Sequence, residues 1–438
     1  MLKHLQLKNV GPAPEMAIEF GSRLNLITGD NGLGKSFLLD VAWWALTRKW
    51  PRDLNHNLTS GYAAKPTNPK KPSTIGFSLT SKTKVVSYTS DYSVRDESWL
   101  GKSGRPWNAG LIIYAHAEGS FSVWDPARNY WQQRGKIDVQ DRVPGYAFSP
   151  QEVWDGLQVE FEGSELTVCN GLLRDWASWI KEAGADASNM EIVLRMLSPS
   201  DLDSDLLKPG PLTRLGINDV RDIPSIKTGY SDCVPILHAS SGVRRIVALA
   251  YMLLWTWREH NLAAHQLGEK PAGQVVLLID ELESHLHPKW QRAILRSLLK
   301  LASVMHNAAT IQLIAATHSP LVMASAEPNF DPDKDAWFDI DYHPHGKTGS
   351  VEIVKRDYTR LGDVSAWLTS GAFDLGEARS LEAEQAMRAA IDLAKRKTHL
   401  KSEIAKVDTL LRNSLGETDR FWARWESFKD QMKVSSKK

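Results

Sequence analysis

Apolar and polar residues alternate in three short runs near the start of the chain. The runs cover residues 5–10, 16–20 and 23–28, and turns containing Gly-Pro or Gly-Ser separate them. Alternation with a period of two predicts strands. The third run ends at Gly29, and an apolar stretch without a helix breaker follows at 36–46. The pattern therefore predicts a strand, a glycine-rich loop and a helix.

Residues 50–75 lose this periodicity and are rich in proline and asparagine. They predict a surface insertion within the longer segment 47–110. Alternating runs then return and predict four more strands, at 75–79, 84–89, 111–116 and 121–124. The last two flank a short turn containing Glu118 and Gly119, which predicts a hairpin.

The second half of the chain changes to longer apolar periods. From 151 to about 197 the spacing is helical, and residues 198–232 are rich in Asp, Pro, Gly and Ser, typical of a connector. Helices are then predicted at 243–259 and 288–302, and strands at 275–279 and 310–316. Such alternation of strands and helices predicts a parallel sheet covered by helices.

The tail from residue 376 to 415 is predicted to be helical. Two sets of residues in it recur every seven positions and predict a heptad seam: Ala390, Lys397, Ile404 and Leu411, with Leu393, Leu400 and Val407 offset by three. This seam is open to two interpretations, since it could pack on the rest of the chain or contact a partner.

Composition narrows the class of protein. The 438 residues are 42% hydrophobic and 24% charged, which excludes a small disulfide scaffold and wholesale disorder. The net charge is +1, so any nucleic-acid contact must come from a local patch. Only Cys169 and Cys233 are present, the start lacks a signal-peptide pattern, and the longest apolar run is too short for a bilayer. We therefore expect a cytoplasmic protein without a membrane partner.

The glycine-rich loop carries the first candidate chemistry. Gly29-Asp-Asn31-Gly32-Leu-Gly34-Lys35-Ser36-Phe37 contains the phosphate-binding pattern G-x-x-x-x-G-K-[ST]. Backbone N–H groups can wrap phosphates there, Lys35 can reach the β and γ phosphates, and Ser36 can ligate Mg²⁺. A plain turn before a helix is the alternative, but the flanking strand and helix favour an ATP and Mg²⁺ site.

An acidic pair supplies the expected second half of such a site. Asp280 and Glu281 follow five apolar residues, so they are expected at the carboxyl end of a buried strand. There Asp280 can hold the Mg²⁺ water shell and Glu281 can polarise the attacking water. A buried strand that ends in two acidic residues is common by itself. Its occurrence in the same chain as the phosphate-binding pattern at 29–36 is what favours a nucleotide site.

Two further segments could contact a nucleotide. Ser240, Ser241 and Gly242 open a helix whose free N–H groups could meet an anion, although a plain N-cap explains them as well. His318 follows directly after the strand at 310–316, which is expected to end near Asp280. A lone histidine there is more often packing than chemistry.

These four motifs, in this order, resemble the ABC-type ATPase head of the group that includes SMC proteins, RecN, RecF and the OLD-family ATPases. The resemblance covers residues 1 to about 320. It implies an α/β fold, with a P-loop parallel core sheet, an antiparallel β layer, a helical lobe and a C-terminal helical extension.

The resemblance also implies roles for these residues. Lys35 and Ser36 would belong to the Walker A motif, Ser240–Gly242 to the signature, Asp280 and Glu281 to Walker B and the catalytic base, and His318 would be the switch histidine. Residues 283–288 fall on the D-loop, where His285 and His287 are read as packing rather than zinc ligands. Gln151 is a candidate for the Mg²⁺-sensing glutamine, or is an ordinary helix start.

The resemblance divides the chain into four parts. Residues 1–150 would form the first part of the nucleotide-binding head, and 151–235 the helical lobe and connector. Residues 236–360 would complete the head, and 361–438 would form a helical region for a partner or for oligomerisation.

Between the motifs there are no long heptad arms, and no nuclease centre is apparent after His318, since Asp339 and Asp341 are read as strand-edge carboxylates. The chain is in this respect similar to ATPase subunits of bacterial anti-phage systems, such as PtuA of Septu and AriA of PARIS. That similarity implies an ATP-hydrolysing sensor that works as a head-to-tail dimer or higher oligomer and controls a separate effector, a nuclease or a toxin.

Two alternatives stay open. A RecF-like or SMC-like DNA-binding protein would need a basic surface, and the sequence offers three candidate groups for it: Arg244 with Arg245, Lys355 with Arg356 and Arg360, and residues 395–397 with Lys401. The other alternative, a scaffold with a vestigial ATPase site, is disfavoured by the intact motifs.

Overall fold

The computed structural model describes residues 1–82, 84–101, 107–128, 131–134, 137–140, 145–161, 163–200, 202, 206–229, 231–305, 309–344, 349–396 and 399–435. The chain forms two compact units, Met1–Gly362 and Asp363–Lys438, which are described separately.

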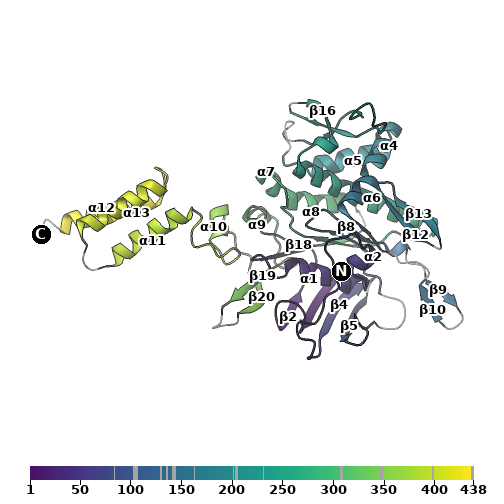
Figure 1. Cartoon of the computed structure of the whole chain (residues 1–438), viewed down its shortest axis with the longest axis horizontal. Helices are drawn as coiled ribbons and strands as arrows, with labels where there is room; N and C mark the ends of the chain where they lie inside the picture. The colour runs from purple at the N-terminus through teal and green to yellow at the C-terminus, as the bar shows by residue number, and fades with distance from the viewer. Residues whose placement is uncertain are drawn as a thin grey trace. The chain divides into compact units, whose positions relative to one another are not determined.

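The first unit is built on an eight-stranded sheet (Figure 1). Its strands, in spatial order, are β11 (Gly145–Phe148), β8 (Phe121–Trp124), β7 (Leu111–Ala115), β17 (Gln274–Ile279), β18 (Thr310–Ala316), β3 (Leu24–Gly29), β19 (Ala336–His343) and β20 (Ser350–Arg356). The five strands from β7 to β19 run parallel, and each outer strand, β11, β8 or β20, pairs antiparallel with its neighbours. The predicted α/β fold with a parallel core sheet is confirmed.

A second, antiparallel sheet forms the predicted β layer. Its strands, in spatial order, are β2 (Glu15–Glu19), β1 (Leu2–Lys8), β4 (Thr74–Ser81), β5 (Lys84–Ser93) and β6 (Ser98–Trp99). Apolar residues of β1, β2 and β4 point to one side, where they join the core of the first unit. The apolar face of this layer is therefore buried in the core of the first unit.

Helix α1 (Lys35–Thr47) lies between the two sheets (Figure 1). Nearly all of its side chains are buried, and the same apolar cluster contains residues of both sheets. Trp43 lies beside Tyr114 of β7, with ring centroids 6.3 Å apart, whereas Trp44 stacks on Trp50 at 5.5 Å. A helix that is apolar on all sides needs such a position.

The segment 50–75 takes part in this packing. It begins with α2 (Pro51–Leu54), and Trp50, Leu58 and Ala64 are buried. Its backbone contacts the antiparallel β layer just after β1, where Thr67 N–H donates to the carbonyl of Asn9 at 2.9 Å.

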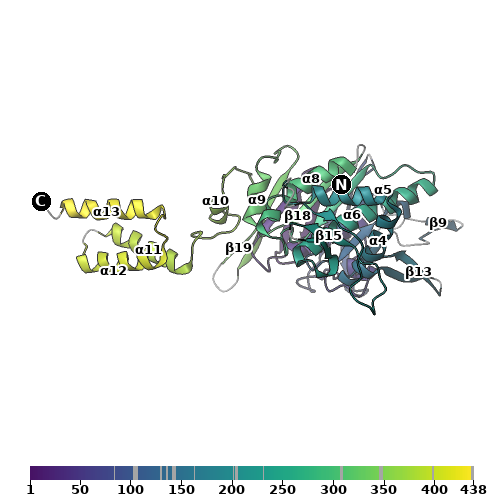
Figure 2. The same cartoon turned by 90° about the horizontal axis from the view of Figure 1, so that it is seen from above.

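Helices cover the other face of the core sheet and continue into a lobe (Figures 1 and 2). They are α3 (Pro150–Asp155), α4 (Leu172–Glu182), α5 (Ala185–Met196), α6 (Ser241–Gln266), α7 (Pro288–Gln291), α8 (Ile294–Met305) and α9 (Pro320–Ala326). Small hairpins and a three-stranded sheet accompany them: β9 (Trp131–Arg134) with β10 (Ile137–Gln140), β12 (Leu157–Phe161) with β13 (Ser164–Cys169), and β14 (Lys208–Pro209) with β15 (Ser225–Thr228) and β16 (Ser231–Pro235).

The prediction of a helical segment from 151 to 197 is wrong in its first third. Helix α3 ends at Asp155, and β12 and β13 form an antiparallel hairpin before α4 begins. The residues around Gly163 alternate between polar and apolar, and this local period of two outweighs the helical spacing further along.

The second unit consists of α10 (Val364–Leu368), α11 (Leu381–Lys395), α12 (Lys401–Ser414) and α13 (Phe421–Ser435). The predicted continuous heptad seam is wrong, because the helix stops at Lys395 and Leu400 is 65% exposed. Ala390, Leu393, Val407 and Leu411 instead meet in a local core that also contains Phe421 and Trp425 of α13. Lys397 lies outside the described residues.

Within the described ranges, none of the helices combines the length and the apolar character needed to cross a bilayer.

We predict that Trp43→Ala destabilises the protein by about 3–5 kcal/mol, because it leaves a cavity between α1 and the core sheet. Trp43→Phe should cost less, since the buried indole N–H of Trp43 has no hydrogen-bond partner among the described residues. Denaturant unfolding measures both, with Tyr62→Ala, at a side chain that is 60% exposed, as the control. Equal midpoints for Trp43→Ala and the control would contradict this packing.

Candidate functional site

Four parallel strands of the core sheet end at the same edge. β3 leads into the glycine-rich loop, β7 into residues 116–120, β17 into Asp280, and β18 into Thr317 and His318. Ligands of open parallel sheets bind beyond the carboxyl ends of the strands. The candidate residues from distant parts of the sequence are thus gathered at one edge.

The glycine-rich loop after β3, predicted to bind phosphate, has a backbone that suits glycine. Gly29, at the end of β3, has φ 132°, and a Cβ there would lie 2.4 Å from the carbonyl oxygen of Ile340 on β19. Asn31 and Ser36 are exposed, and Gly32 and Gly34 also have positive φ. Phe37 of α1 packs against Gly11, in the turn between β1 and β2.

Lys35 points back into its own loop. Its Nζ donates to the carbonyls of Gly29 at 2.7 Å and Asp30 at 2.8 Å. Burial lowers the pKa of Lys35, and the negative charge of Asp280 is the largest opposing influence. The ammonium is therefore held where a phosphate in the loop would meet it.

Asp280 is almost fully buried at the end of β17, with 4% exposure. Burial raises its pKa to about 6, the Ser36 hydroxyl opposes this rise, and the charges of Glu281 and Glu118 add to it. A hydroxyl and crowded carboxylates are hard oxygen ligands with surplus negative charge. These residues fit Mg²⁺.

Glu281 sits at a turn that is fixed on both sides. Asp280 N–H donates to the Ala115 carbonyl of β7 at 2.9 Å, and Leu282 N–H donates to the Ala316 carbonyl of β18 at 3.1 Å. Between these two anchors Glu281 has φ 46°, a left-handed conformation that is unfavourable for a residue with a Cβ. Strain of this kind is concentrated at functional sites.

His318 is half-buried after β18. Its backbone N–H donates to Glu283 Oε1 at 2.6 Å, and the Thr317 hydroxyl donates to Glu283 Oε2 at 2.6 Å. Burial, followed by the charge of Lys35, lowers the pKa of His318. The imidazole is accordingly neutral at neutral pH.

The predicted signature residues begin α6. Ser240 and Ser241 are exposed, and Ser240 Oγ accepts from the N–H of Val243 at 3.4 Å. Gly242 is buried, and a Cβ on it would lie 2.6 Å from the carbonyl oxygen of His285. The start of α6 therefore packs on the turn that follows Glu281.

Arg245, one turn further along α6, joins this helix to the sheet edge. Its guanidinium donates to the carbonyls of Ala117 at 2.8 Å, His116 at 3.1 Å and Asp280 at 3.4 Å. Arg245 thus fixes the signature helix to the ends of β7 and β17.

The sequence analysis missed a polar cluster after β7. Glu118 Oε1 accepts from the hydroxyls of Ser60 at 2.6 Å and Ser120 at 2.7 Å. Burial opposes ionisation of Glu118, but these hydrogen bonds and His116 together lower its pKa. Like Asp280, Glu118 follows an apolar strand, and this signal could have found it. Ser60 had no such signal, because it comes from the segment 50–75.

The structure does not bring Gln151 to this cluster. Gln151 is exposed at the start of α3, and its Nε2 donates to Asp155 Oδ2 at 3.4 Å. The preceding strand, β11, is separated from β17 by β8 and β7. The strand that adjoins β17 on this side is β7, not β11. The acidic residue that follows β7 is Glu118.

Asp40 lies below the loop on α1, where it accepts from the Tyr114 hydroxyl at 3.0 Å. Burial raises its pKa to about 8, the hydrogen bond from Tyr114 opposes this, and the charges of Asp280 and Glu118 add to it. Asp40 is another carboxyl group near this edge that is costly to ionise in the folded protein.

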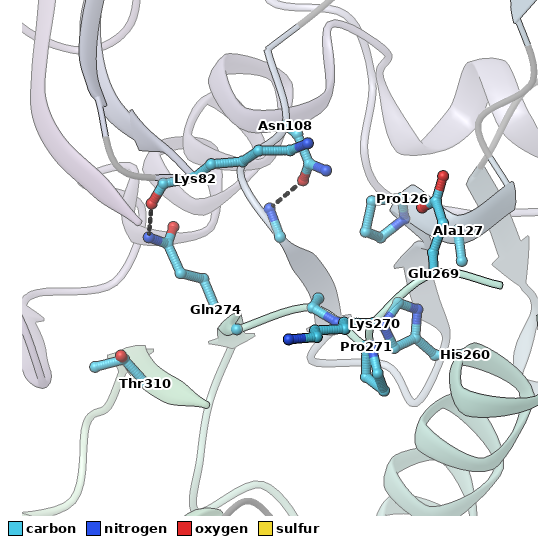
Figure 3. A pocket seen from close by; sticks show the side chains of 13 residues that line it. Lys82, Asn108, Pro126, Ala127, His260, Glu269, Lys270, Pro271, Gln274 and Thr310 are labelled. Atoms are coloured by element: carbon cyan, nitrogen blue, oxygen red, sulfur yellow. Dashed lines mark hydrogen bonds between the residues drawn. The ribbon is translucent and has the colours of Figure 1, made fainter. Parts of the chain in front are cut away.

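A separate cavity of about 640 Å³ lies at the opposite ends of the strands (Figure 3). Gly110, Gln274 and Thr310, which lie at the amino ends of β7, β17 and β18, line it. Gln274 Nε2 donates to the Lys82 carbonyl at 2.8 Å beside it (Figure 3). Its place at the amino ends argues against a nucleotide site there.

Other candidate clusters are occupied by internal contacts. Asp339 and Asp341 of β19 both pair with Arg356 of β20, with Asp339 Oδ2 3.4 Å from Arg356 Nε. In the part of the chain that the structure describes, no group of three or more His, Cys, Asp or Glu could hold a metal. His285 and His287 therefore form no zinc site with described residues.

Comparison with known proteins decides the family. Residues 24–324, more than half of the chain, match the family described as "AAA domain, putative AbiEii toxin, Type IV TA system". The chain belongs to this family. The predicted resemblance to this class of ATPases is confirmed.

One curated relative is "Retron Vc95 probable ATPase" of Vibrio cholerae serotype O1 biovar El Tor. It is 35% identical over 104 residues, which make up 24% of this chain and 18% of that protein. The match therefore spans less than a fifth of the relative's length.

Three of the similar solved structures share little sequence identity with the chain. The SMC head domain from Thermotoga maritima is 17% identical, with a TM-score of 0.38, covering 81% of this chain and 99% of that one. An Smc head domain bound to the C-terminal domain of ScpA, derived from Pyrococcus furiosus, is 13% identical, with a TM-score of 0.41 and coverage of 81% and 96%. The recombination mediator protein RecF is 15% identical, with a TM-score of 0.35 and coverage of 78% and 96%.

We predict that Gly242→Ala lowers steady-state ATP hydrolysis by about fivefold or more, because the new Cβ would displace the backbone of His285 and shift the turn that carries Glu281. Gly184→Ala is the matched control, since a Cβ there meets nothing within 4 Å. The contact has no bearing on activity if both variants hydrolyse ATP like the wild type.

Asp40→Asn tests how much the carboxyl group of Asp40 destabilises the folded protein when it is ionised. In the folded protein the pKa of Asp40 is raised from 3.8 to about 8, so unfolding releases a proton between these values and stability falls as pH rises from 4 to 8. Without Mg²⁺ or nucleotide, the variant should exceed the wild type in free energy of unfolding at pH 8 by up to about 5 kcal/mol, because each unit of pKa difference corresponds to about 1.4 kcal/mol. Denaturant unfolding across this range should show the difference shrinking towards pH 4, and a pH-independent difference would contradict it.

Proposed function

We propose that this ATPase binds MgATP at the carboxyl edge of the core sheet. The observation that carries the proposal is the convergence of Lys35, Asp280, Glu281 and His318 at the ends of neighbouring strands. Lys35 would turn from the loop carbonyls to the β and γ phosphates. Ser36 and Asp280 would hold Mg²⁺, which when bound neutralises the phosphate charge.

The chain's own residues would then prepare the hydrolytic step. Glu281, which follows Asp280 directly and has a left-handed backbone, would orient the attacking water and accept its proton. His318, neutral and half-buried, would donate a hydrogen bond to the γ-phosphate. Glu281 lies close enough to Lys35 for its charge to raise the pKa of Lys35, and the charge of Lys35 in turn lowers the pKa of His318.

We further propose that two copies act head to tail. The exposed hydroxyls of Ser240 and Ser241, and the N–H groups at the start of α6, would close over the γ-phosphate held by the partner copy. Bound ATP would then stabilise the dimer, and hydrolysis would loosen it. The buried Gly242 allows α6 to begin directly on the turn after Glu281.

In the cell, this cycle would serve a regulator of anti-phage defence. The family description mentions the AbiEii toxin and a type IV toxin–antitoxin system, and one relative is the probable ATPase of a retron. These relationships support a sensor subunit that controls a separate effector, a nuclease or a toxin. Residues 1–150 and 236–360 would form its ATPase head, 151–235 the lobe, and 361–438 the region for a partner.

A DNA-binding role receives less support from the side chains. Two of the cations that a basic surface would need are already engaged within the protein: Arg245 donates to backbone carbonyls, and Arg356 pairs with the carboxylates of Asp339 and Asp341. Among the described members of these groups, Arg244 lies on α6 and Lys355 on β20, whereas Lys395 and Lys401 belong to α11 and α12 of the second unit.

Two variants separate nucleotide binding from hydrolysis. Lys35→Ala should weaken binding of a fluorescent ATP analogue by about tenfold or more, because it removes charge-assisted hydrogen bonds to phosphate. Glu281→Gln should bind normally but hydrolyse slowly, so an ATP-dependent dimer should accumulate. Fluorescence titration and sedimentation velocity measure these outcomes. Equal affinity and no dimer in both variants would refute the proposal.

A further inference from the structure

The turn at residues 281–287 contacts both the signature helix and the switch histidine. Glu281 and His285 both have left-handed backbones, with φ 46° and 61°. Ser284 N–H donates to the Glu281 carbonyl at 2.8 Å, and Leu286 N–H donates to the Glu283 carbonyl at 2.9 Å. These bonds form two overlapping tight turns that tie residues 281–286 together.

Both carboxylate oxygens of Glu283 accept hydrogen bonds from the residues that follow β18. Oε1 accepts from the backbone N–H of His318 and Oε2 from the hydroxyl of Thr317, each at 2.6 Å. Hydrogen bonds to an ionised acceptor are short and about twice as strong as neutral ones. The backbone of His318 is thereby tied to the turn that carries Glu281.

Ser319, which follows His318, makes hydrogen bonds that do not involve Glu283. Ser319 Oγ accepts from the N–H of Val322 at 3.2 Å, capping α9, and donates to Gln291 Oε1 at 2.7 Å. Loss of the Glu283 carboxylate would therefore free the backbone N–H of His318. The Thr317 N–H would stay bonded to the Ile27 carbonyl of β3 at 3.0 Å, and α9 would stay capped by Ser319.

We propose that Glu283 is a positioning residue that places His318 for hydrolysis and makes its position follow the turn at 281–287. The same turn abuts Gly242 through the His285 carbonyl, so seating of the signature helix and placement of His318 are linked within one protomer. This inference deepens the proposed function, because it rests on His318 serving the γ-phosphate.

The first test is a double-mutant cycle on the full-length protein. Glu283→Ala should lower kcat by about tenfold or more, with little change in the affinity for an ATP analogue, because misplacement of a catalytic group is costly. In a His318→Ala background the same change should lower kcat by less than about twofold, since Glu283 acts through His318. Equal losses in both backgrounds would overturn the proposal.

Glu283→Gln is the conservative control for the cycle. Its amide oxygen can accept from the His318 N–H, and the Thr317 hydroxyl can rotate to accept from the amide nitrogen. This variant should keep kcat within about threefold of the wild type. If glutamine is as damaging as alanine, the hydrogen bonds do not carry the effect and the proposal fails.

Hydrogen exchange gives a second readout that needs no turnover. The amide of His318 should lose protection in Glu283→Ala and keep it in Glu283→Gln, whereas the Leu313 amide, which donates to the Arg23 carbonyl at 2.7 Å, should be unchanged in both. Unchanged protection at His318 in Glu283→Ala would overturn the tether. An inactive wild type with the expected exchange pattern would refute the proposed role of the site in hydrolysis while leaving the tether standing.

Discussion

An imbalance of charge governs the carboxyl edge of the core sheet. The carboxylates of Asp280, Asp30, Glu283 and Glu281 act on the buried ammonium of Lys35, and three of these four also act on the guanidinium of Arg245. Burial and neighbouring carboxylates raise the pKa of Asp280, so the site is costly to keep ionised without additional positive charge. A divalent cation is the natural remedy, and phosphates then supply the charge that Lys35 is placed to meet. This balance of charge supports the proposed binding of ATP together with Mg²⁺.

The backbone keeps these groups in place by attaching each loop to a neighbouring strand. Asp280 and Leu282 bond to β7 and β18 on either side of Glu281, and Arg245 ties α6 to the ends of β7 and β17. Catalytic groups carried on rigid elements hold their geometry better than groups on free loops. The cost is the left-handed backbone of Glu281, which the surrounding hydrogen bonds oblige the chain to adopt.

Much of the fold could be predicted because local pattern and global structure agree. Alternating runs gave strands, the breaker-free stretch after the glycines gave α1, and the apolar run before Asp280 gave the central strand β17. The tail was misjudged for a physical reason: a seven-residue repeat does not distinguish one long helix from two that fold back on each other. The break after Lys395 lets Leu393 and Leu411 share a core within the same unit.

The sequence by itself determined which chemistry is present, since the spacing of Gly29, Lys35 and Ser36 and the acids after an apolar run are local patterns. Only the tertiary structure decided which side chains meet. Ser60 reaches Glu118, and Glu283 holds His318, through pairings between segments far apart in sequence. No local periodicity encodes such contacts, because they depend on the order in which strands line up in the sheet and on how tightly the intervening loops pack.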